Sequence, residues 1–283
     1  MKFQHLLSGF AFSVIWSSAF TSAKIAMLYA PPFLLLSIRF FISGILGIIL
    51  ARLMGQKANF SRAVWISIII FGVCQNTVYL GLNFVSMQWI DASLAAIIAS
   101  LLPIIVAALS VILLRERFSN WTFLGLTAGV LGVLMLAQEK ISYRIELLGT
   151  ILCFAAVISL ATATIILRNI KDNNIVMIVG IQMFVGGFTL FPISFLFETW
   201  DIIWSKELVL AFWYTTLIPG LFATILWLKL LNQIGPTKAA SFHFLNPFFG
   251  VLIANLILKE PLLPQHLLGV IVIMIGILAV QKN

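Results

Sequence analysis

The chain has 283 residues, of which 62% are hydrophobic and 9% are charged. Soluble domains carry about 25% charged residues, so this composition excludes a water-facing surface over most of the chain and a sizeable soluble catalytic domain. The net charge of +8 comes from 17 Lys and Arg against 9 Asp and Glu, and because these basic residues lie between apolar runs they indicate membrane orientation rather than nucleic-acid binding.

Ten apolar runs follow one another along the chain, each close to the roughly 20 residues that a helix needs to cross the hydrocarbon core. The predicted transmembrane helices cover residues 4–24, 33–53, 64–84, 91–113, 121–137, 147–167, 175–197, 208–231, 237–258 and 265–281. Proline, glycine and short polar clusters mark many of the gaps between them. The sequence therefore predicts an all-α integral membrane protein of ten transmembrane helices.

The distribution of basic residues predicts the orientation of these helices. With the N-terminus in the cytoplasm, eleven Lys and Arg residues fall on the cytoplasmic side and five fall outside. Basic residues favour the cytoplasmic side, so we expect a multi-pass protein of the bacterial inner membrane with both termini in the cytoplasm. The two cysteines, Cys74 and Cys153, lie inside apolar runs and match no zinc or disulfide pattern, so no metal or cofactor is expected.

The two halves of the chain are related by one ungapped shift of 144 residues. The shift pairs Pro103 with Pro247, Glu116 with Glu260, Gly125 with Gly269 and Gly132 with Gly276. It predicts two five-helix repeats, residues 1–140 and 145–283. Because five is an odd number of spans, the repeats must have opposite orientations, and inverted repeats are typical of secondary transporters with a binding site near the midplane.

Polar and aromatic side chains inside the spans are the first candidates for that site, because polar groups are costly in lipid unless they pair or face water. Gln75, Asn76 and Tyr79 share one face of the third span, where they either hydrogen-bond a polar solute or pair with a neighbouring helix. Trp16 in the first span and Trp227 in the eighth lie deep enough to stack on a solute, although packing is the common role of such rings.

The ninth span adds a second polar group, composed of Ser241, His243 and Asn246. Pro247 is expected to free the backbone carbonyl of His243 for a solute or ion, and the alternative is a packed histidine at a kink. The prolines expected to kink helices or to gate are Pro103, Pro219 and Pro247. No Asp or Glu lies in the middle of a span, so either His243 couples transport to protons or the protein is a facilitator or exchanger.

Charged residues near the span ends are expected to be structural. Arg39 lies some seven residues into the second span and is expected to reach the outer interface. Glu116 and Glu260 end their spans beside Arg115 and Lys259, which predicts local ion pairs that close the repeat ends.

In both halves a proline is followed thirteen residues later by a glutamate, and the second span carries Arg39 and Phe40. With ten short-looped spans, this pattern resembles the EamA family of the drug/metabolite transporter superfamily over essentially the whole chain. The resemblance implies a central cavity lined by spans 1, 3, 4, 6, 8 and 9. It also implies export of metabolites such as amino acids, or of cationic drugs.

The favoured function is therefore a secondary transporter that works by alternating access. We expect its substrate to be an amino acid, a similar zwitterionic or neutral solute, or a drug-like compound, with export as the expected direction. Its partners are then this solute and the lipid bilayer, and the protein is a monomer or a weak homodimer. The alternatives are a channel and an intramembrane enzyme, but the three histidines are scattered and no catalytic motif can be assembled.

Overall fold

The structure is a computed structural model that describes residues 3–137, 147–167, 174–258 and 264–282. All secondary structure in these residues is helical. In chain order the helices are α1 (Phe3–Met27), α2 (Pro32–Leu53), α3 (Arg62–Gly72), α4 (Gly81–Ser86), α5 (Ala92–Ala99), α6 (Leu102–Leu114), α7 (Asn120–Ala137), α8 (Leu147–Leu167), α9 (Ile175–Phe197), α10 (Lys206–Thr215), α11 (Ala223–Ile234), α12 (Pro236–Ala240), α13 (Asn246–Leu258) and α14 (Pro264–Gln281).

Seven continuous helical stretches of the described chain are long and apolar enough to cross a membrane. They are Phe3–Met27, Pro32–Leu53, Arg62–Ser86, Leu94–Leu114, Leu147–Leu167, Ile175–Phe197 and Lys206–Ile234. Two shorter apolar stretches lie in α7 and α14, and α12 continues into α13 through a 3₁₀ segment, Ser241–Leu245. The predicted all-helical fold is confirmed, whereas the number of ten transmembrane helices remains a prediction.

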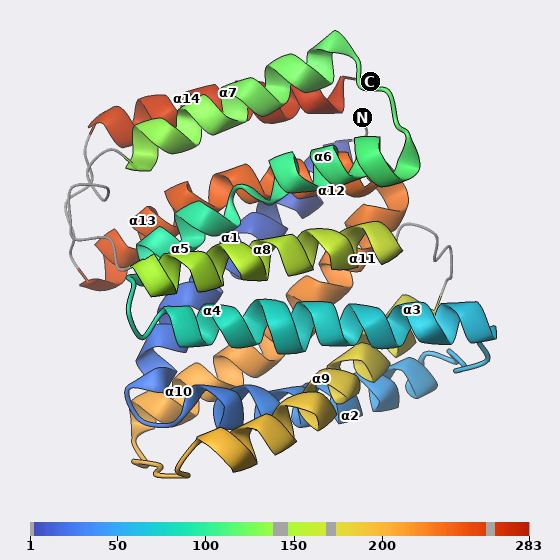
Figure 1. The fold of residues 1–283 in the computed structure, drawn as a ribbon, viewed down its shortest axis with the longest axis vertical. Helices are drawn as coiled ribbons and strands as arrows, with labels where there is room; N and C mark the ends of the chain where they lie inside the picture. The colour runs from blue at the N-terminus through green and yellow to red at the C-terminus, as the bar shows by residue number, and fades with distance from the viewer. Residues whose placement is uncertain (1–2, 138–146, 168–173, 259–263, 283) are drawn as a thin grey trace.

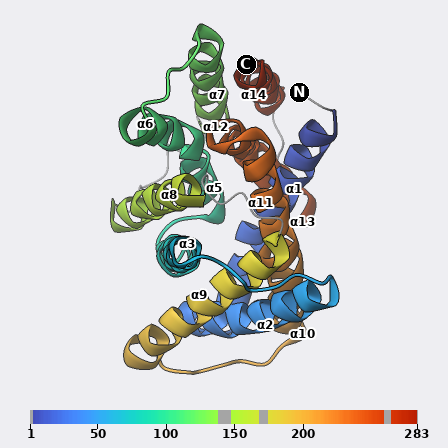
Figure 2. The same cartoon turned by 90° about the vertical axis from the view of Figure 1, so that its right-hand side faces the viewer.

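The helices run roughly side by side, and two helix pairs mark opposite ends of the long axis (Figures 1 and 2). Helices α7 and α14 form one pair, and α2 and α9 form the other. The remaining helices lie between these pairs and contain most of the buried core, which includes Phe12, Trp16, Tyr79, Leu102 and Trp227. A central region of packed helices is therefore flanked by a helix pair on each side.

Helices α7 and α14 approach each other so closely because glycines meet at their crossing. A β-carbon at Gly125 would lie 2.6 Å from the carbonyl oxygen of Gly276, and one at Gly132 would lie 2.7 Å from that of Gly269. Small residues allow such backbone contact between membrane helices. As the chain advances from 125 to 132 in α7, its contact moves back from 276 to 269 in α14, so the two helices are antiparallel.

Helices α2 and α9 are packed in the same manner. A β-carbon at Gly44 would lie 2.7 Å from the backbone nitrogen of Phe184, and one at Gly180 would lie 2.7 Å from that of Ile48. The hydroxyl of Ser37 also donates a hydrogen bond of 3.2 Å to the carbonyl of Gly187. These contacts run in opposite directions along the two helices, which makes this pair antiparallel as well.

Several helices end at residues that differ by the 144-residue shift found in the sequence. Helix α6 covers residues 102–114 and α13 covers 246–258, while α7 covers 120–137 and α14 covers 264–281. Two π-helical segments, Val73–Leu80 and Thr216–Phe222, interrupt the third and eighth spans at nearly equivalent positions. The two halves of the chain therefore break and resume their helices at corresponding places.

The kink prolines lie at helix starts or within a π segment, not inside regular α-helices. Pro103 and Pro247 lie in the first turn of α6 and α13, and Pro219 lies within the second π segment. The prediction of a free backbone carbonyl at His243 is wrong, because the N–H of Asn246 donates to this carbonyl across the 3₁₀ turn. The tighter turn supplies the partner that proline cannot provide.

Candidate substrate cavity

A small cavity of about 30 Å³ lies between the two halves of the chain. This volume holds roughly two water molecules, while ligand pockets usually measure about 300–1,000 Å³. The cavity of this structure is therefore smaller than an ordinary ligand pocket. Among its lining residues are Trp16, Arg39, Asn76, Tyr79 and Asn83 from the first half and Met183, Pro219 and Thr224 from the second.

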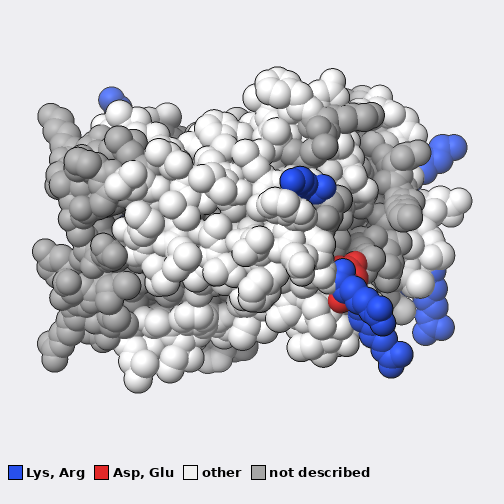
Figure 3. Space-filling model, turned by 90° about the horizontal axis from the view of Figure 1, so that it is seen from above, with Lys and Arg blue, Asp and Glu red and all other residues white. Residues whose placement is uncertain are grey.

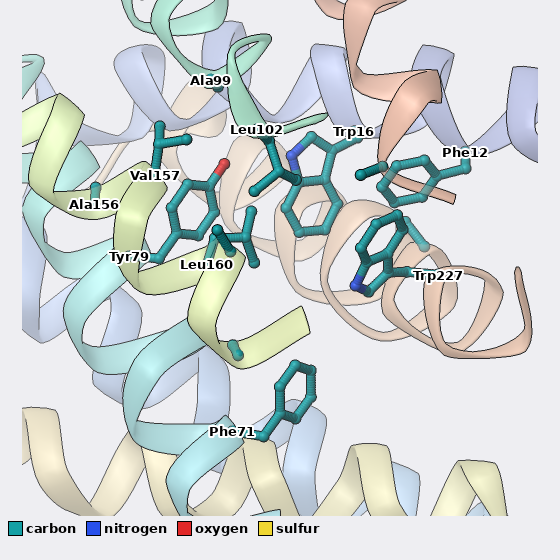
Figure 4. Close-up of a cluster of buried hydrophobic side chains, with 14 of the residues drawn as sticks. Phe12, Trp16, Phe71, Tyr79, Ala99, Leu102, Ala156, Val157, Leu160 and Trp227 are labelled. Carbon is teal, nitrogen blue, oxygen red and sulfur yellow. The ribbon is translucent and has the colours of Figure 1, made fainter. Parts of the chain in front are cut away.

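Trp16 and Tyr79 form one wall of the cavity. Their rings are nearly parallel, with an interplanar angle of 14° and centroids 6.3 Å apart. Figure 4 shows Trp16 between Tyr79 on one side and the Phe12–Trp227 pair on the other. Both residues predicted here from the sequence are thus brought together, and they give the cavity a flat aromatic surface.

Two asparagines of the third span lie beside this wall, and both are held by neighbouring groups. Asn76 donates from its side-chain amide to the carbonyl and to the side-chain oxygen of Gln182 in α9. Asn83 donates to the carbonyl of Tyr79 at 2.9 Å and accepts from the thiol of Cys153 at 3.3 Å. Asn76 thus joins two helices, which agrees with the alternative prediction that this face pairs with a neighbouring helix. Its Oδ1 atom has no partner among the described residues.

An aromatic cluster made of Phe12, Trp16, Trp227 and His243 fills the space next to the cavity. The Trp227 ring stacks on Phe12 with centroids 5.1 Å apart, and the His243 ring meets Trp227 edge-on at 5.1 Å. His243 also contacts Phe12 and Trp16 edge-on. Trp227 and His243 are each 1% exposed and do not line the cavity, so in this state they pack rather than face a solute.

Asn246 joins this cluster to α1. Its side-chain nitrogen lies 2.9 Å from Nδ1 of His243, and its side-chain oxygen accepts a hydrogen bond of 3.3 Å from Ser17. Ser13 donates to the carbonyl of Phe242 at 2.8 Å. These hydrogen bonds fix the 3₁₀ segment against α1, which explains why the polar residues of this segment are buried.

Ser241 and Gln75 are, like Trp227, His243 and Asn246, predicted site residues that do not line the cavity. Ser241 donates to the carbonyl of Lys238 at 2.8 Å and accepts from Gln281 at 3.2 Å, so it faces α14. Gln75 is 1% exposed and its Oε1 atom has no partner among the described residues. Neither side chain lines the cavity, and for both a substrate role stays a prediction.

Arg39 lines the cavity, although the sequence did not indicate it as a site residue. Its expected position at the outer interface is wrong, because the side chain is 5% exposed and lines the cavity beside Phe40. Its position inside a predicted span could have indicated a site residue, since a charge within the membrane is costly and usually functional. Of the span-end glutamates, Glu260 lies outside the described residues, so its predicted ion pair with Lys259 is not described.

No cluster of three or more His, Cys, Asp or Glu residues that could hold a metal ion occurs within the described ranges. The described carboxylates lie at helix ends or in loops, and Glu198 illustrates their use. Its two oxygens accept the backbone N–H groups of Phe33 at 2.7 Å and Leu34 at 2.9 Å. A carboxylate at these amides caps the start of α2 and ties it to the end of α9.

The comparisons with known proteins agree with this architecture. The model of the EamA-like transporter family matches residues 5–138 and again residues 147–281. The uncharacterized transporter YvbV of Bacillus subtilis (strain 168) is 24% identical over 272 residues, which cover 95% of this chain and 89% of YvbV. The uncharacterized inner membrane transporter YedA of Escherichia coli (strain K12) is 25% identical over 294 residues, which cover 100% of this chain and 94% of YedA.

A solved crystal structure shares the fold, with a TM-score of 0.82 at 17% sequence identity over 99% of this chain and 96% of the other. At this identity the likeness concerns the fold alone. The family model, in contrast, covers nearly the whole chain in two consecutive matches. This chain belongs to the EamA-like transporter family.

Proposed function

We propose that this membrane protein is a carrier that moves a small metabolite across the inner membrane by alternating access. The observation that carries the proposal is the position of the cavity, which side chains of both halves line together. A site between two similar halves can open to either side when the halves exchange conformations. A carrier role, in preference to an enzyme or an open channel, agrees with the transporter names of its relatives.

The proposed halves are two inverted repeats, residues 1–140 and 145–283. In support, the corresponding helices α7 and α14 are antiparallel, and so are α2 and α9. Gly125 meets Gly276 while Gly132 meets Gly269, and this reciprocal pattern is typical of a two-fold relation between equivalent elements. The π segments give the third and eighth spans a local irregularity at the cavity, where helices commonly bend at functional sites.

The proposed direction of transport is export of an amino acid or a similar small solute. Flux assays in proteoliposomes with labelled amino acids, nucleosides and quaternary-ammonium compounds test this function. We expect saturable flux of one class. No flux of any class, with or without a pH gradient, would contradict a carrier, and flux that does not saturate would favour a channel.

The hydroxyl of Thr224 provides a site-directed form of the same test. Thr224 is 2% exposed, lines the cavity and has no hydrogen-bond partner among the described residues. We expect Thr224→Val to lower the kcat/KM of flux about 2- to 10-fold, because it removes one solute hydrogen bond at constant shape. The exposed Thr127, which bonds only within its own helix, supplies the control Thr127→Val. Equal flux in the two variants would remove Thr224 from the site.

We further propose that both termini lie in the cytoplasm. The start of α1 and the end of α14 lie at the same end of the bundle (Figure 1). Most of the Lys and Arg side chains visible in Figure 3 gather at this end, which supports a cytoplasmic position.

Cysteine labelling tests this orientation in intact cells. Lys57 and Thr199 are exposed in loops that follow α2 and α9. We expect a membrane-impermeant thiol reagent to label Thr199→Cys directly and Lys57→Cys only after permeabilisation. The parent chain, whose Cys74 is half-buried and Cys153 buried, controls for background. The reverse labelling pattern would invert the proposed topology.

A further inference from the structure

Arg39 is a buried cation that has no counterion among the described residues. It lies seven residues after the start of α2, is 5% exposed and lines the cavity. It forms no hydrogen bond or ion pair with any residue of the described chain, and its Nε atom is both buried and unpartnered. A guanidinium group is always charged and offers five N–H donors.

An aromatic ring and a hydroxyl that already donates elsewhere lie next to Arg39. The guanidinium carbon lies 5.1 Å from the centroid of the Phe40 ring. Ser43 donates its hydroxyl to the carbonyl of Thr216 at 2.9 Å. A β-carbon at Gly220 would lie 3.6 Å from Nε of Arg39, so the absence of a side chain at this position keeps the space beside the guanidinium open.

Burying an ion without a counterion is strongly unfavourable, and among the described residues the Phe40 ring offsets only part of this cost. The carboxylate of Glu198 is directed at the N-terminal amides of α2. An anion in the cavity would neutralise Arg39, and a carboxylate matches its planar fork with two parallel hydrogen bonds.

We propose that Arg39 binds the carboxylate of the transported solute. This inference rests on the proposed carrier function and narrows its substrate to a small organic acid or zwitterion. The cavity then holds the carboxylate at Arg39 while the apolar part of the solute contacts Trp16 and Tyr79. A cationic drug is excluded from the same site, because its charge would face an unneutralised guanidinium.

Matched probes that differ at one group test this assignment. Leucine is a zwitterion, 4-methylpentanoate is the same acid without the amino group, and leucinamide retains the amino group but lacks the carboxylate. Phenylalanine, 3-phenylpropanoate and phenylalaninamide form a second set. Binding to the purified protein is measured as a shift in thermal unfolding, and flux is measured by inhibition of labelled solute in proteoliposomes.

Three variants accompany the parent chain. Arg39→Gln removes the charge and the fork, Arg39→Lys retains the charge alone, and Arg52→Gln removes an exposed arginine from the same helix. We expect the carboxylate probes of at least one set to bind the parent and Arg52→Gln, and the amides to bind neither. Affinity for the carboxylates should fall about 10- to 100-fold in Arg39→Gln, with a smaller loss in Arg39→Lys.

The thermal midpoint without probe separates binding from a structural role. Because Arg39→Gln removes an unpaired buried charge, we expect its midpoint to equal or exceed that of the parent, whereas a structural arginine would give a lower one. Should Arg39→Gln fail to fold, binding of the amide probes by the parent chain, matched by Arg39→Lys, overturns the proposal.

Other outcomes also distinguish this inference from the carrier function. Amides that bind as tightly as acids, or saturable flux of cations or nucleosides that is unchanged in Arg39→Gln, would overturn the role of Arg39 and leave the carrier intact. Absence of binding and of flux for every class would overturn both.

Discussion

Trp227→Ala is expected to lower the stability of the protein by about 3–5 kcal/mol, the usual cost of truncating a large buried aromatic side chain. Trp227 is 1% exposed, stacks on Phe12 with centroids 5.1 Å apart and meets His243 edge-on at the same distance. Its loss removes one ring contact from Phe12 and one from His243, both of which keep their contacts with Trp16 in the middle of the bundle. Thermal unfolding in detergent, followed by tryptophan fluorescence and by size-exclusion chromatography, measures this effect.

Two matched variants distinguish packing from solute contact. Trp204 is 77% exposed, so Trp204→Ala should leave the midpoint unchanged. Trp227→Phe keeps an aromatic ring and removes an indole N–H that has no partner among the described residues, so we expect near-parent stability and flux. If Trp227→Phe is stable but loses flux, Trp227 contacts the solute in another state of the transport cycle, as the sequence predicted.

Gly125→Ala is expected to destabilise the protein by about 1–3 kcal/mol, the usual cost of overpacking. The added β-carbon would lie 2.6 Å from the carbonyl oxygen of Gly276 and 2.7 Å from the backbone nitrogen of Val280. These are backbone atoms, so α7 and α14 must move apart to admit the methyl group. The thermal midpoint of the purified protein measures the loss.

The same substitution at Gly81 provides the control. There the nearest atom, on the Phe33 ring, would lie 3.4 Å from the β-carbon, which is ordinary contact, and alanine favours a helix over glycine. We expect Gly81→Ala to retain or raise the parent midpoint. Equal midpoints for Gly125→Ala and Gly81→Ala would contradict the close approach of α7 and α14.

The positions of the helices agree closely with the apolar runs predicted from the sequence. The run expected at 175–197 is α9, and the run expected at 33–53 is α2 with one added residue. The run expected at 91–113 corresponds to the span Leu94–Leu114, with a turn at Ser100 and Leu101, and the run expected at 237–258 is divided by the 3₁₀ segment Ser241–Leu245. A proline lies within four residues after each of these irregular segments and removes a backbone donor. Whether the helix is interrupted or only bent there depends on the packing of neighbouring helices.

Membrane helices can be located from sequence because lipid requires every span to be long and apolar. The sequence by itself therefore determined the helical class, the approximate limits of the spans and the 144-residue relation of the halves. It also indicated Trp16, Asn76 and Tyr79 as residues of a common site, since deep polar and aromatic groups are few in such a chain.

Only the tertiary structure decided which of these groups face the cavity. The rotation of each helix and its π or 3₁₀ segments are set by contacts with helices far away in the sequence, such as Asn76 with Gln182 and Ser17 with Asn246. Thus Ser241 faces α14, His243 is packed among aromatic rings, and Arg39 is directed into the cavity. The sequence shows that a charge lies inside a span. Whether that charge has a partner depends on the helices packed around it.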